Sequence, residues 1–485
     1  MSPLPPATEA AADFRPCIPP PWRIRNDGRY VVVYECATGS LKHRVLSPVQ
    51  AMLAPFMDGS YSAAELIGIG ENLLGGALGA RCGEIDLDWE VRCLQQAEWI
   101  SDGGPPSPSL TGDRSSLVPD FRRYEPPSRR LDRPLAITAT LTHYCRTDCI
   151  YCYAERRVER ELGFDEWVRL FDEARANEIF SVDPAGGDIF ARKDGLRLLT
   201  EMARREFTFF VSTKCPIARD LAEALADIGV GRLDGEPHLR RDLQFSVDSV
   251  DPVVADRLVG RRNYLQRAND SVRNCIAAGL SPRVKSVLTS LNADAAMGIV
   301  GHFAALGVRR FHFVQYGRTH FRHDDGLFLT AAQKAALPDQ LAAIRDRFPE
   351  CDIQMQIESG DATTARKQNW GNRASCSGGR LQMVVKPDGD VTLCDQIPQT
   401  DEFVVGNVRE SGLMGAWTSP RVEAFLTRPR DAFVGKPCAA CGEFDRCHSA
   451  SDIGYCFRDS LFAFGNILEA PPSCPRQSQV GLRQI

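Results

Sequence analysis

The chain has 485 residues, of which 43% are hydrophobic and 25% are charged, and its formal net charge is −5. At about 100–200 residues per domain, this length predicts about three domains with ample apolar residues for their cores. The balanced charge gives no electrostatic reason to expect binding to nucleic acid or to an anionic membrane. No run approaches the roughly 18 apolar residues of a spanning helix, and the N-terminal residues lack a secretory signal pattern. We therefore expect a soluble, cytoplasmic protein without nucleic-acid or membrane partners.

Cysteine is the informative residue type, with 17 copies in the chain. In a reducing compartment, clustered cysteines serve metal binding or redox chemistry more often than disulfide bonds. Three cysteines fall within residues 145–152 and seven within residues 376–474, and the scattered remainder are expected to be small buried hydrophobic residues. The clustering indicates metal sites.

Residues 16–102 predict a small α+β domain. The run YVVVY at residues 30–34 is typical of a strand, Ser47 and Ser62 are placed to cap two helices, and a third helix is expected around Val91. Residues 103–133 are rich in Pro, Ser, Gly and Arg, which predicts a linker.

Residues 134–350 alternate short β-rich runs with amphipathic helical patterns. Six strands are expected, at residues 135–141, 179–182, 207–212, 243–247, 283–288 and 310–314. Six strand–helix repeats predict a parallel α/β sheet, either a barrel or part of one, whose chemistry lies at the carboxyl ends of the strands. From about residue 369 the alternation is lost, and a Cys-, Gly- and Pro-rich composition predicts a region that metal stabilises.

Cys145, Cys149 and Cys152 directly follow the first expected strand, in the spacing CxxxCxxC. Three thiolates can bind three irons of a [4Fe–4S] cluster and leave the fourth iron open to a small molecule. The alternative is a structural zinc site, with His143 as the fourth ligand.

This spacing, with aromatic residues beside it and its position after the first strand of a partial barrel, resembles the radical S-adenosylmethionine (SAM) enzymes. The resemblance implies a partial (β/α)6 barrel and a cluster whose open iron binds SAM. Reductive cleavage of SAM then gives a 5′-deoxyadenosyl radical that abstracts hydrogen from the substrate. Residues 212–214 (STK) depart from the Thr-Asn-Gly that relatives often carry, and Asp188 stands where the family has Glu. The cofactor contacts implied by the resemblance are Tyr151, Gly186, Gly187, Asp188, Ser246 and Asp248.

The C-terminal cysteines resemble the SPASM extension of peptide-modifying radical SAM enzymes, expected here at residues 369–478, which holds two auxiliary [4Fe–4S] clusters. Eight residues separate Cys447 from Cys456, where the family has three. We expect a five-residue insertion; the alternative is an altered first site, with Ser451 at the usual cysteine position and His448 as a substitute ligand. The resemblance assigns Cys376, Cys394 and Cys456 to the first auxiliary cluster, and Cys438, Cys441, Cys447 and Cys474 to the second.

Asp395 directly follows Cys394. In the sulfatase-maturing relatives an Asp at this place is the base that deprotonates the substrate, so the resemblance implies a catalytic role for Asp395. The alternative is a surface Asp that caps a turn.

Residues 16–102 resemble the PqqD-like leader-recognition domain, a winged-helix-like module that binds the leader of a precursor peptide, often as an added strand. A DNA-binding winged helix is disfavoured because a basic recognition helix is missing. Together the resemblances imply a radical SAM oxidoreductase that matures a ribosomally synthesised peptide, forming an intrapeptide C–C or thioether crosslink. They imply three [4Fe–4S] clusters, SAM, and an electron donor such as flavodoxin or ferredoxin. The alternatives are a maturase of a protein substrate, of the sulfatase formylglycine or amine-dehydrogenase thioether type, and a zinc-stabilised binding protein.

Overall fold

The computed structural model describes residues 13–37, 39–74, 87–127, 130–156, 160–234, 239–356, 376–449 and 455–477. The chain divides into two compact units, Met1–Leu135 with Glu236–Leu239, and Ala136–Gly235 with Arg240–Ile485. Within the described ranges, no helix is both long and apolar enough to cross a membrane.

The first unit packs helices on a three-stranded antiparallel sheet, in the order β2-β3-β4. As predicted, Ser47 and Ser62 begin helices, and each forms a capping box with the residue three positions later. The strands are β2 (Trp22–Asn26), β3 (Val31–Glu35) and β4 (His43–Val45), with a separate short pair of β1 (Pro16–Cys17) and β5 (Ser101–Asp102). The helices are α1 (Pro48–Leu53), α2 (Ala63–Leu73) and α3 (Leu87–Gln95).

The segment 103–133, predicted as a linker, packs on the first unit where it is described. It forms the 3-10 turns η3 (Pro108–Leu110), η4 (Ser115–Leu117) and η5 (Phe121–Arg123). Leu110 and Leu117 are buried in the same core as Ile24. The amide of Ile24 donates to Ser109 Oγ over 3.2 Å, so this segment also covers the outer edge of β2. Its composition lacks any regular period, but single leucines are enough to anchor it.

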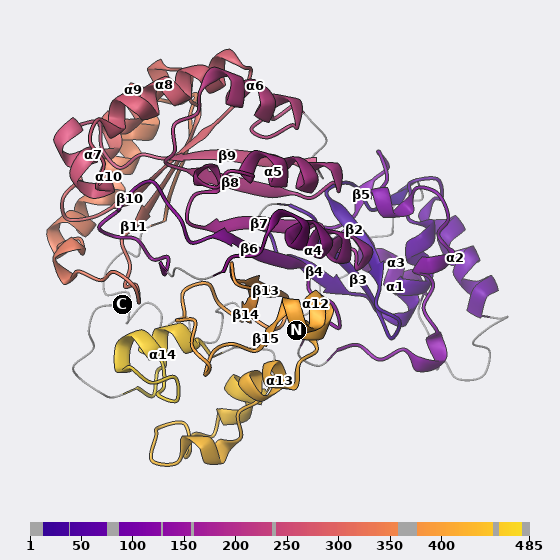
Figure 1. Ribbon diagram of the computed structural model, residues 1–485. Helices are drawn as coiled ribbons and strands as arrows, with labels where there is room; N and C mark the ends of the chain where they lie inside the picture. The colour runs from indigo at the N-terminus through magenta and orange to yellow at the C-terminus, as the bar shows by residue number, and fades with distance from the viewer. Residues whose placement is uncertain are drawn as a thin grey trace. The chain divides into compact units, whose positions relative to one another are not determined.

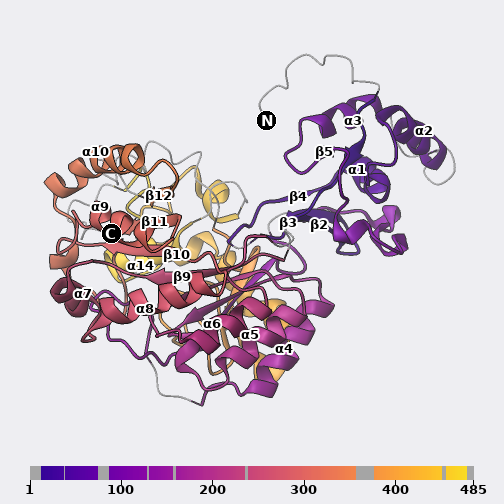
Figure 2. The same ribbon diagram turned by 90° about the horizontal axis from the view of Figure 1, so that it is seen from above.

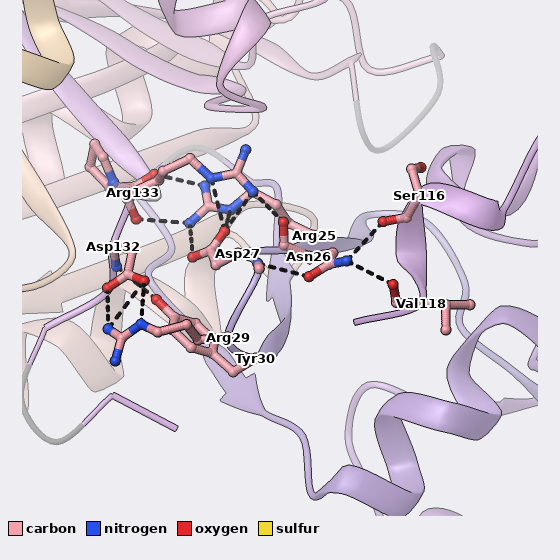
Figure 3. Close-up of polar contacts among 11 residues, drawn as sticks. Arg25, Asn26, Asp27, Arg29, Tyr30, Ser116, Val118, Asp132 and Arg133 are labelled. Atoms are coloured by element: carbon pink, nitrogen blue, oxygen red, sulfur yellow. Dashed lines mark hydrogen bonds and ion pairs between the residues drawn. The ribbon is translucent and has the colours of Figure 1, made fainter. Parts of the chain in front are cut away.

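A buried ion cluster holds the end of this segment to β2 (Figure 3). The side chains of Arg25 and Asp27 have no exposed area, and Arg25 Nε lies 2.8 Å from Asp27 Oδ1. Arg133 Nη2 lies 2.7 Å from the same oxygen. Arg25 also donates to the carbonyls of Arg133 and Pro134 over 2.8 and 2.9 Å. Two guanidinium groups therefore share one carboxylate and fix the chain just before the second unit begins.

The second unit is built on parallel strands, which pair as β6-β7 and as β8-β9-β10-β11-β12. A parallel bridge between Ser181 and Thr208 joins β7 to β8. The strands are β6 (Ala136–Thr142), β7 (Ser181–Gly186), β8 (Phe209–Thr213), β9 (Arg241–Ser246), β10 (Arg283–Leu288), β11 (Arg310–Gln315) and β12 (Asp352–Gln356). The alternation confirms the predicted α/β fold. β12 was not predicted, and β7 continues past Pro184 to Gly186, where strand propensity alone would end it.

Helices follow the strands and lie on the outer side of the curved sheet (Figures 1 and 2). Apolar residues of the strands, such as Val211 and Leu243, are buried against Leu198 and other apolar residues of these helices. The strand residues on the opposite side, such as Phe210, Gln244 and Lys285, line a cavity and are both apolar and polar. The helices are α4 (Phe164–Ala176), α5 (Gly195–Arg204), α6 (Arg219–Asp227), α7 (Pro252–Val259), α8 (Tyr264–Ala277), α9 (Ala296–Ala305) and α10 (Ala331–Arg347).

The cysteine-rich region joins the edge of this sheet. β13 (Gln382–Val385) pairs in parallel with β6, and β14 (Asp390–Thr392) and β15 (Gly406–Asn407) continue the sheet antiparallel. Three helices follow, α12 (Val408–Trp417), α13 (Pro420–Leu426) and α14 (Phe457–Phe464). A small separate core contains Phe433, Cys438, Phe444, Tyr455 and Ala470.

Candidate active site

The loop after β6 carries the first three clustered cysteines. Cys149 is buried, and Cys145 and Cys152 are half-buried. Thr147 lies between two of them, with its Oγ1 3.1 Å from Cys145 Sγ and 3.7 Å from Cys149 Sγ. Burial raises the pKa of Cys149, and the positive charge of Lys214 opposes this effect. The three thiols and Lys214 therefore belong to one electrostatic site.

The glycines at the end of β7 support this loop through close backbone contacts. Gly187 N donates to Thr142 O over 2.7 Å, and Asp188 N donates to Tyr144 O over 3.0 Å. A Cβ on Gly187 would lie 2.0 Å from Tyr144 O, and one on Gly186 would lie 2.5 Å from Thr142 O. Neither contact leaves space for a side chain, so both glycines are required for β7 to approach the cysteine loop.

The end of α7 supports the loop from another direction. Asp148 N donates to Val259 O over 2.9 Å, and Ile150 N donates to Leu258 O over 3.1 Å. Gly260 follows with a φ of 64°, and a Cβ there would lie 2.6 Å from Asp148 O. The cysteine loop is thus fixed by two elements that are distant in sequence.

Asp188 is a buried carboxylate whose two oxygens are both hydrogen-bonded within the protein. Thr213 Oγ1 donates to Oδ1 over 3.0 Å and to Oδ2 over 2.9 Å. The amides of Lys214 and Cys215 donate to Oδ2 over 2.8 and 3.1 Å, and Phe190 N donates to Oδ1 over 3.1 Å. Asp188 therefore joins the end of β7 to the end of β8. Its predicted contact with the SAM ammonium stays a prediction.

Tyr151 and Asp248, both predicted to contact the cofactor, contact each other. The Tyr151 hydroxyl donates to Asp248 Oδ2, and Val287 N donates to Oδ1 over 2.8 Å. Asp248 is fully buried. Ser246 is half-buried, with its hydroxyl 3.3 Å from that of Ser212. The predicted role of Asp248 toward the nucleoside stays a prediction, since here its carboxylate anchors the cysteine loop.

A cavity of about 1000 Å³ opens at the carboxyl ends of these strands, as the rule for parallel α/β folds predicts. Residues of the C-terminal region, Asp395, Gln396, Arg458 and Phe462, also line it. The predicted site residues on its wall are Cys145, Cys149, Cys152, Tyr151, Gly186, Gly187, Asp188, Ser246 and Asp395.

The residues on this wall fit a [4Fe–4S] cluster with SAM. Cys145, Cys149 and Cys152 lie on the wall of a cavity of about 1000 Å³, which has room for a group larger than a single metal ion. Three thiolates can bind three irons of such a cluster and leave the fourth iron open. His143, the fourth ligand of the alternative zinc site, does not line this cavity.

The charges of the C-terminal cysteines act on one another. Burial raises the pKa of Cys438 to about 12, and the thiols that add to the shift are Cys474, Cys441 and Cys447. Burial likewise raises the pKa of Cys394 and of Cys456 to about 12, and Cys376 adds to both shifts. The assignment of these seven cysteines to two auxiliary clusters stays a prediction.

His448, the alternative ligand, is packed among aromatic rings. Its ring centroid lies 4.5 Å from that of Phe433, 4.4 Å from Phe444 and 4.6 Å from Tyr455. Burial lowers its pKa to about 4. The charge of Cys376 acts on Cys456. Ser451 lies outside the described residues, and so does most of the segment between Cys447 and Cys456 that is predicted to hold the insertion.

Asp395 is the half-buried carboxylate at the C-terminal side of the cavity. Among the described residues, its side chain accepts only a long contact of 3.9 Å from the Cys394 thiol. Unlike the carboxylate of Asp188, it therefore has oxygens available to a ligand in the cavity.

Several cavity residues were not predicted from the sequence. Lys285, Gln244 and Gln356 lie on the inner faces of the strands, and Lys214 lies at the end of β8. Lys285 alternates with the buried Val284 and Ser286 in the strand RVKSVL, and a charged residue at an inward position of a strand is the signal that would have found it.

Comparisons with known proteins agree with this geometry. Residues 140–293 match the family described as the Radical SAM superfamily, and residues 376–442 match SPASM, described as an iron-sulfur cluster-binding domain. The mycofactocin maturase MftC of Mycolicibacterium smegmatis is 27% identical over 377 residues, which cover 74% of this chain and 87% of that protein. The PqqA peptide cyclase of Methylocella silvestris is 24% identical over 350 residues, which cover 70% of this chain and 87% of that protein.

The fold is similar over nearly the whole chain to solved structures of SuiB from Streptococcus suis. The structure of SuiB bound to its precursor peptide SuiA has a TM-score of 0.63 at 16% identity and covers 96% of this chain and 99% of that one. The structure bound to S-adenosylmethionine has a TM-score of 0.61 at 15% identity, with 95% and 99% covered.

Proposed function

We propose that this radical SAM enzyme, which carries a SPASM domain, modifies a ribosomally synthesised precursor peptide by forming an intrapeptide C–C or thioether crosslink. The observation that carries the proposal is the shared cavity, in which the cysteine loop after β6 faces Asp395 of the SPASM region. The related mycofactocin maturase and PqqA peptide cyclase are named for action on peptides, and SuiB is solved with a precursor peptide.

Cys145, Cys149 and Cys152 would hold a [4Fe–4S] cluster that leaves one iron for SAM. When bound and reduced, this pair supplies the radical that abstracts hydrogen from the substrate. The chain's own residues hold the loop in place: Gly187 and Asp188 from β7, and Asp248 through Tyr151. They also shield the site, since Cys149, Tyr151 and Asp248 are buried.

Crosslinking removes two hydrogens from the peptide, so the site needs a proton acceptor and an electron acceptor. We assign the first role to Asp395, whose oxygens are available in the cavity. Cys376, Cys394 and Cys456 would hold an auxiliary [4Fe–4S] cluster next to it, and Cys438, Cys441, Cys447 and Cys474 a second, giving three clusters in all. A flavodoxin or ferredoxin would deliver the electron that starts the reaction.

The first unit is proposed to bind the leader of the precursor peptide. In its sheet, the outer edge of β2 is covered by η3 and η4. β4 lies at the other edge, and His43 and Arg44 in it are exposed. A strand edge of this kind can pair with an added peptide strand through main-chain hydrogen bonds.

The test is anaerobic incubation of reconstituted enzyme with SAM, a reductant and the short peptide encoded beside the gene. The expected product is the peptide lighter by two hydrogen atoms, together with 5′-deoxyadenosine. A Cys145/Cys149/Cys152→Ala variant should give neither product. Asp395→Asn should form 5′-deoxyadenosine and leave the peptide largely uncrosslinked. An unmodified peptide with the wild-type enzyme would reject the proposal, and modification of a leaderless peptide at the same rate would reject leader binding.

A further inference from the structure

Lys285 is a cation on the inner wall of the cavity. It lies in the middle of β10, and the parallel register sets it beside Ser246 of β9 and His312 of β11. Lys285 and Ser246 both line the cavity. Among the described residues, the Lys285 side chain has no hydrogen bond or ion pair.

The carboxylates around Lys285 are already bound to other groups. Asp248 accepts from Tyr151 and from Val287 N. Asp242, in β9, lies 2.8 Å from Arg310 of β11 and forms an ion pair with it. Within the described ranges, these contacts leave Lys285 without a carboxylate in ion-pair contact, and the charge of Asp248 acts on it only at longer range.

The arginines on the cavity wall, in contrast, are paired. Arg156 lies 2.9 Å from Asp148, Arg318 lies 3.1 Å from Asp325, and Arg458 lies 2.8 Å from Asp459. Lys214 faces the thiols of the cysteine loop and the ring of Tyr151, so it belongs to the cluster site. Among the described residues of this wall, Lys285 is therefore the cation that stays available to a substrate.

The surroundings of Lys285 oppose an unpaired charge. Burial lowers its pKa, and Arg283 and Lys214 add to this effect. Beside it in the register, His312 Nε2 is buried without a hydrogen-bond partner among the described residues, and so is Gln315 Oε1 at the end of β11. A cation kept among such groups is stabilised when a ligand brings an anion, and Gln315 adds an acceptor for a peptide N–H.

We propose that Lys285 binds a carboxylate of the substrate peptide, from either an acidic side chain or the C-terminus, and so selects the residue presented in the cavity. This inference rests on the proposed function in taking a peptide as the substrate. The site itself is tested without turnover.

The test is equilibrium dialysis of radiolabelled probes against the anaerobically reconstituted full-length enzyme with saturating SAM, which keeps the cluster site occupied. N-acetylglutamate α-amide is compared with N-acetylglutamine α-amide, and N-acetylglycylglycine with its amide. The variants are Lys285→Met, Lys285→Arg and, as a matched control, Lys193→Met at an exposed lysine outside the cavity.

Wild type should bind one carboxylate probe about tenfold or more tightly than its amide. Preference for the glutamate probe assigns the site to an acidic side chain, and preference for the glycylglycine acid assigns it to the C-terminus. Lys285→Met should lose the preference, whereas Lys285→Arg and Lys193→Met should keep it. Equal binding of acids and amides, or an unchanged preference in Lys285→Met, would overturn the inference. A preference without modification of the precursor peptide would reject the proposed function and leave this site standing.

Discussion

The hydroxyl of Tyr151 donates to the carboxylate of Asp248, which joins the cysteine loop after β6 to the end of β9. Both groups are buried, and Asp248 also accepts from the amide of Val287 in β10. One hydrogen-bonded pair therefore links the loop of Cys145, Cys149 and Cys152 to the wall that carries Ser246 and Lys285.

Tyr151→Phe should destabilise the second unit and weaken SAM binding. The change leaves Asp248 Oδ2 buried without its donor, which costs about 1–3 kcal/mol. Chemical denaturation and equilibrium dialysis of SAM measure the two effects. Tyr153→Phe is the matched control, because Tyr153 lies in the same loop but is 43% exposed. Equal stability of the two variants would show that the pair does not hold the loop.

Gly187→Ala should lower iron binding at the first cysteine motif and leave the auxiliary sites intact. The new Cβ would lie 2.0 Å from Tyr144 O, so the backbone before Cys145 must move. Gly317→Ala is the control, since Gly317 lines the same cavity and a Cβ there meets nothing within 4 Å. Iron analysis and the electron paramagnetic resonance signal with SAM measure the loss. A normal SAM-dependent signal in Gly187→Ala would contradict this role.

The sequence predicts most of the fold of the second unit, and the reasons are visible in single elements. The apolar strands with regular period, such as residues 283–288, match in position. β7 was predicted too short because Pro184 and Gly186 have low strand propensity, whereas the packing of Gly186 and Gly187 on the cysteine loop favours the strand there. Propensity cannot report such a tertiary contact.

The gathering of Cys145, Cys149 and Cys152 on one cavity wall could be predicted because their spacing is local in the chain. The partners of Asp188 and Asp248 could not, since Thr213 and Tyr151 reach them from distant parts of the sequence. The same limit applies to residues 103–133, whose composition indicates a linker although Leu110 and Leu117 are buried.

Asp183 should make stability depend on pH. Burial raises its pKa to about 7, and its Oδ1 is buried with no hydrogen-bond partner among the residues that the structure describes. An unfolded Asp titrates near pH 3.9, so between about pH 4 and 7 the folded state binds more protons. The stabilisation that protonated Asp183 contributes to the folded state is therefore complete below about pH 4. It decreases as the pH rises to about 7 and is lost above that pH.

Asp183→Asn should remove this part of the pH dependence, because the amide cannot ionise. The free energy of unfolding, measured by urea denaturation at about pH 5.5 and about pH 8, should differ less in Asp183→Asn than in wild type. Asp165→Asn, at an exposed position in α4, is the control and should keep the wild-type difference. Identical slopes in wild type and Asp183→Asn would refute the assignment.

Asp27→Asn should destabilise the first unit by about 3–5 kcal/mol, because it leaves the buried Arg25 and its neighbour Arg133 without their shared carboxylate. Asp132→Asn, whose side chain is 36% exposed and pairs with Arg29, should cost less than about 1 kcal/mol. Hydrogen exchange at residues 22–35 in the full chain measures both. Similar exchange in the two variants would argue against the cluster as the anchor of this segment.

The most direct measurement is the iron and sulfide content of the anaerobically purified protein, with its electron paramagnetic resonance spectrum, for wild type and the Cys145/Cys149/Cys152→Ala variant. One catalytic and two auxiliary clusters predict about twelve irons in wild type and about eight in the variant. About eight irons that fall to about four would show that an auxiliary cluster is missing. Zinc without iron would contradict the radical SAM account altogether.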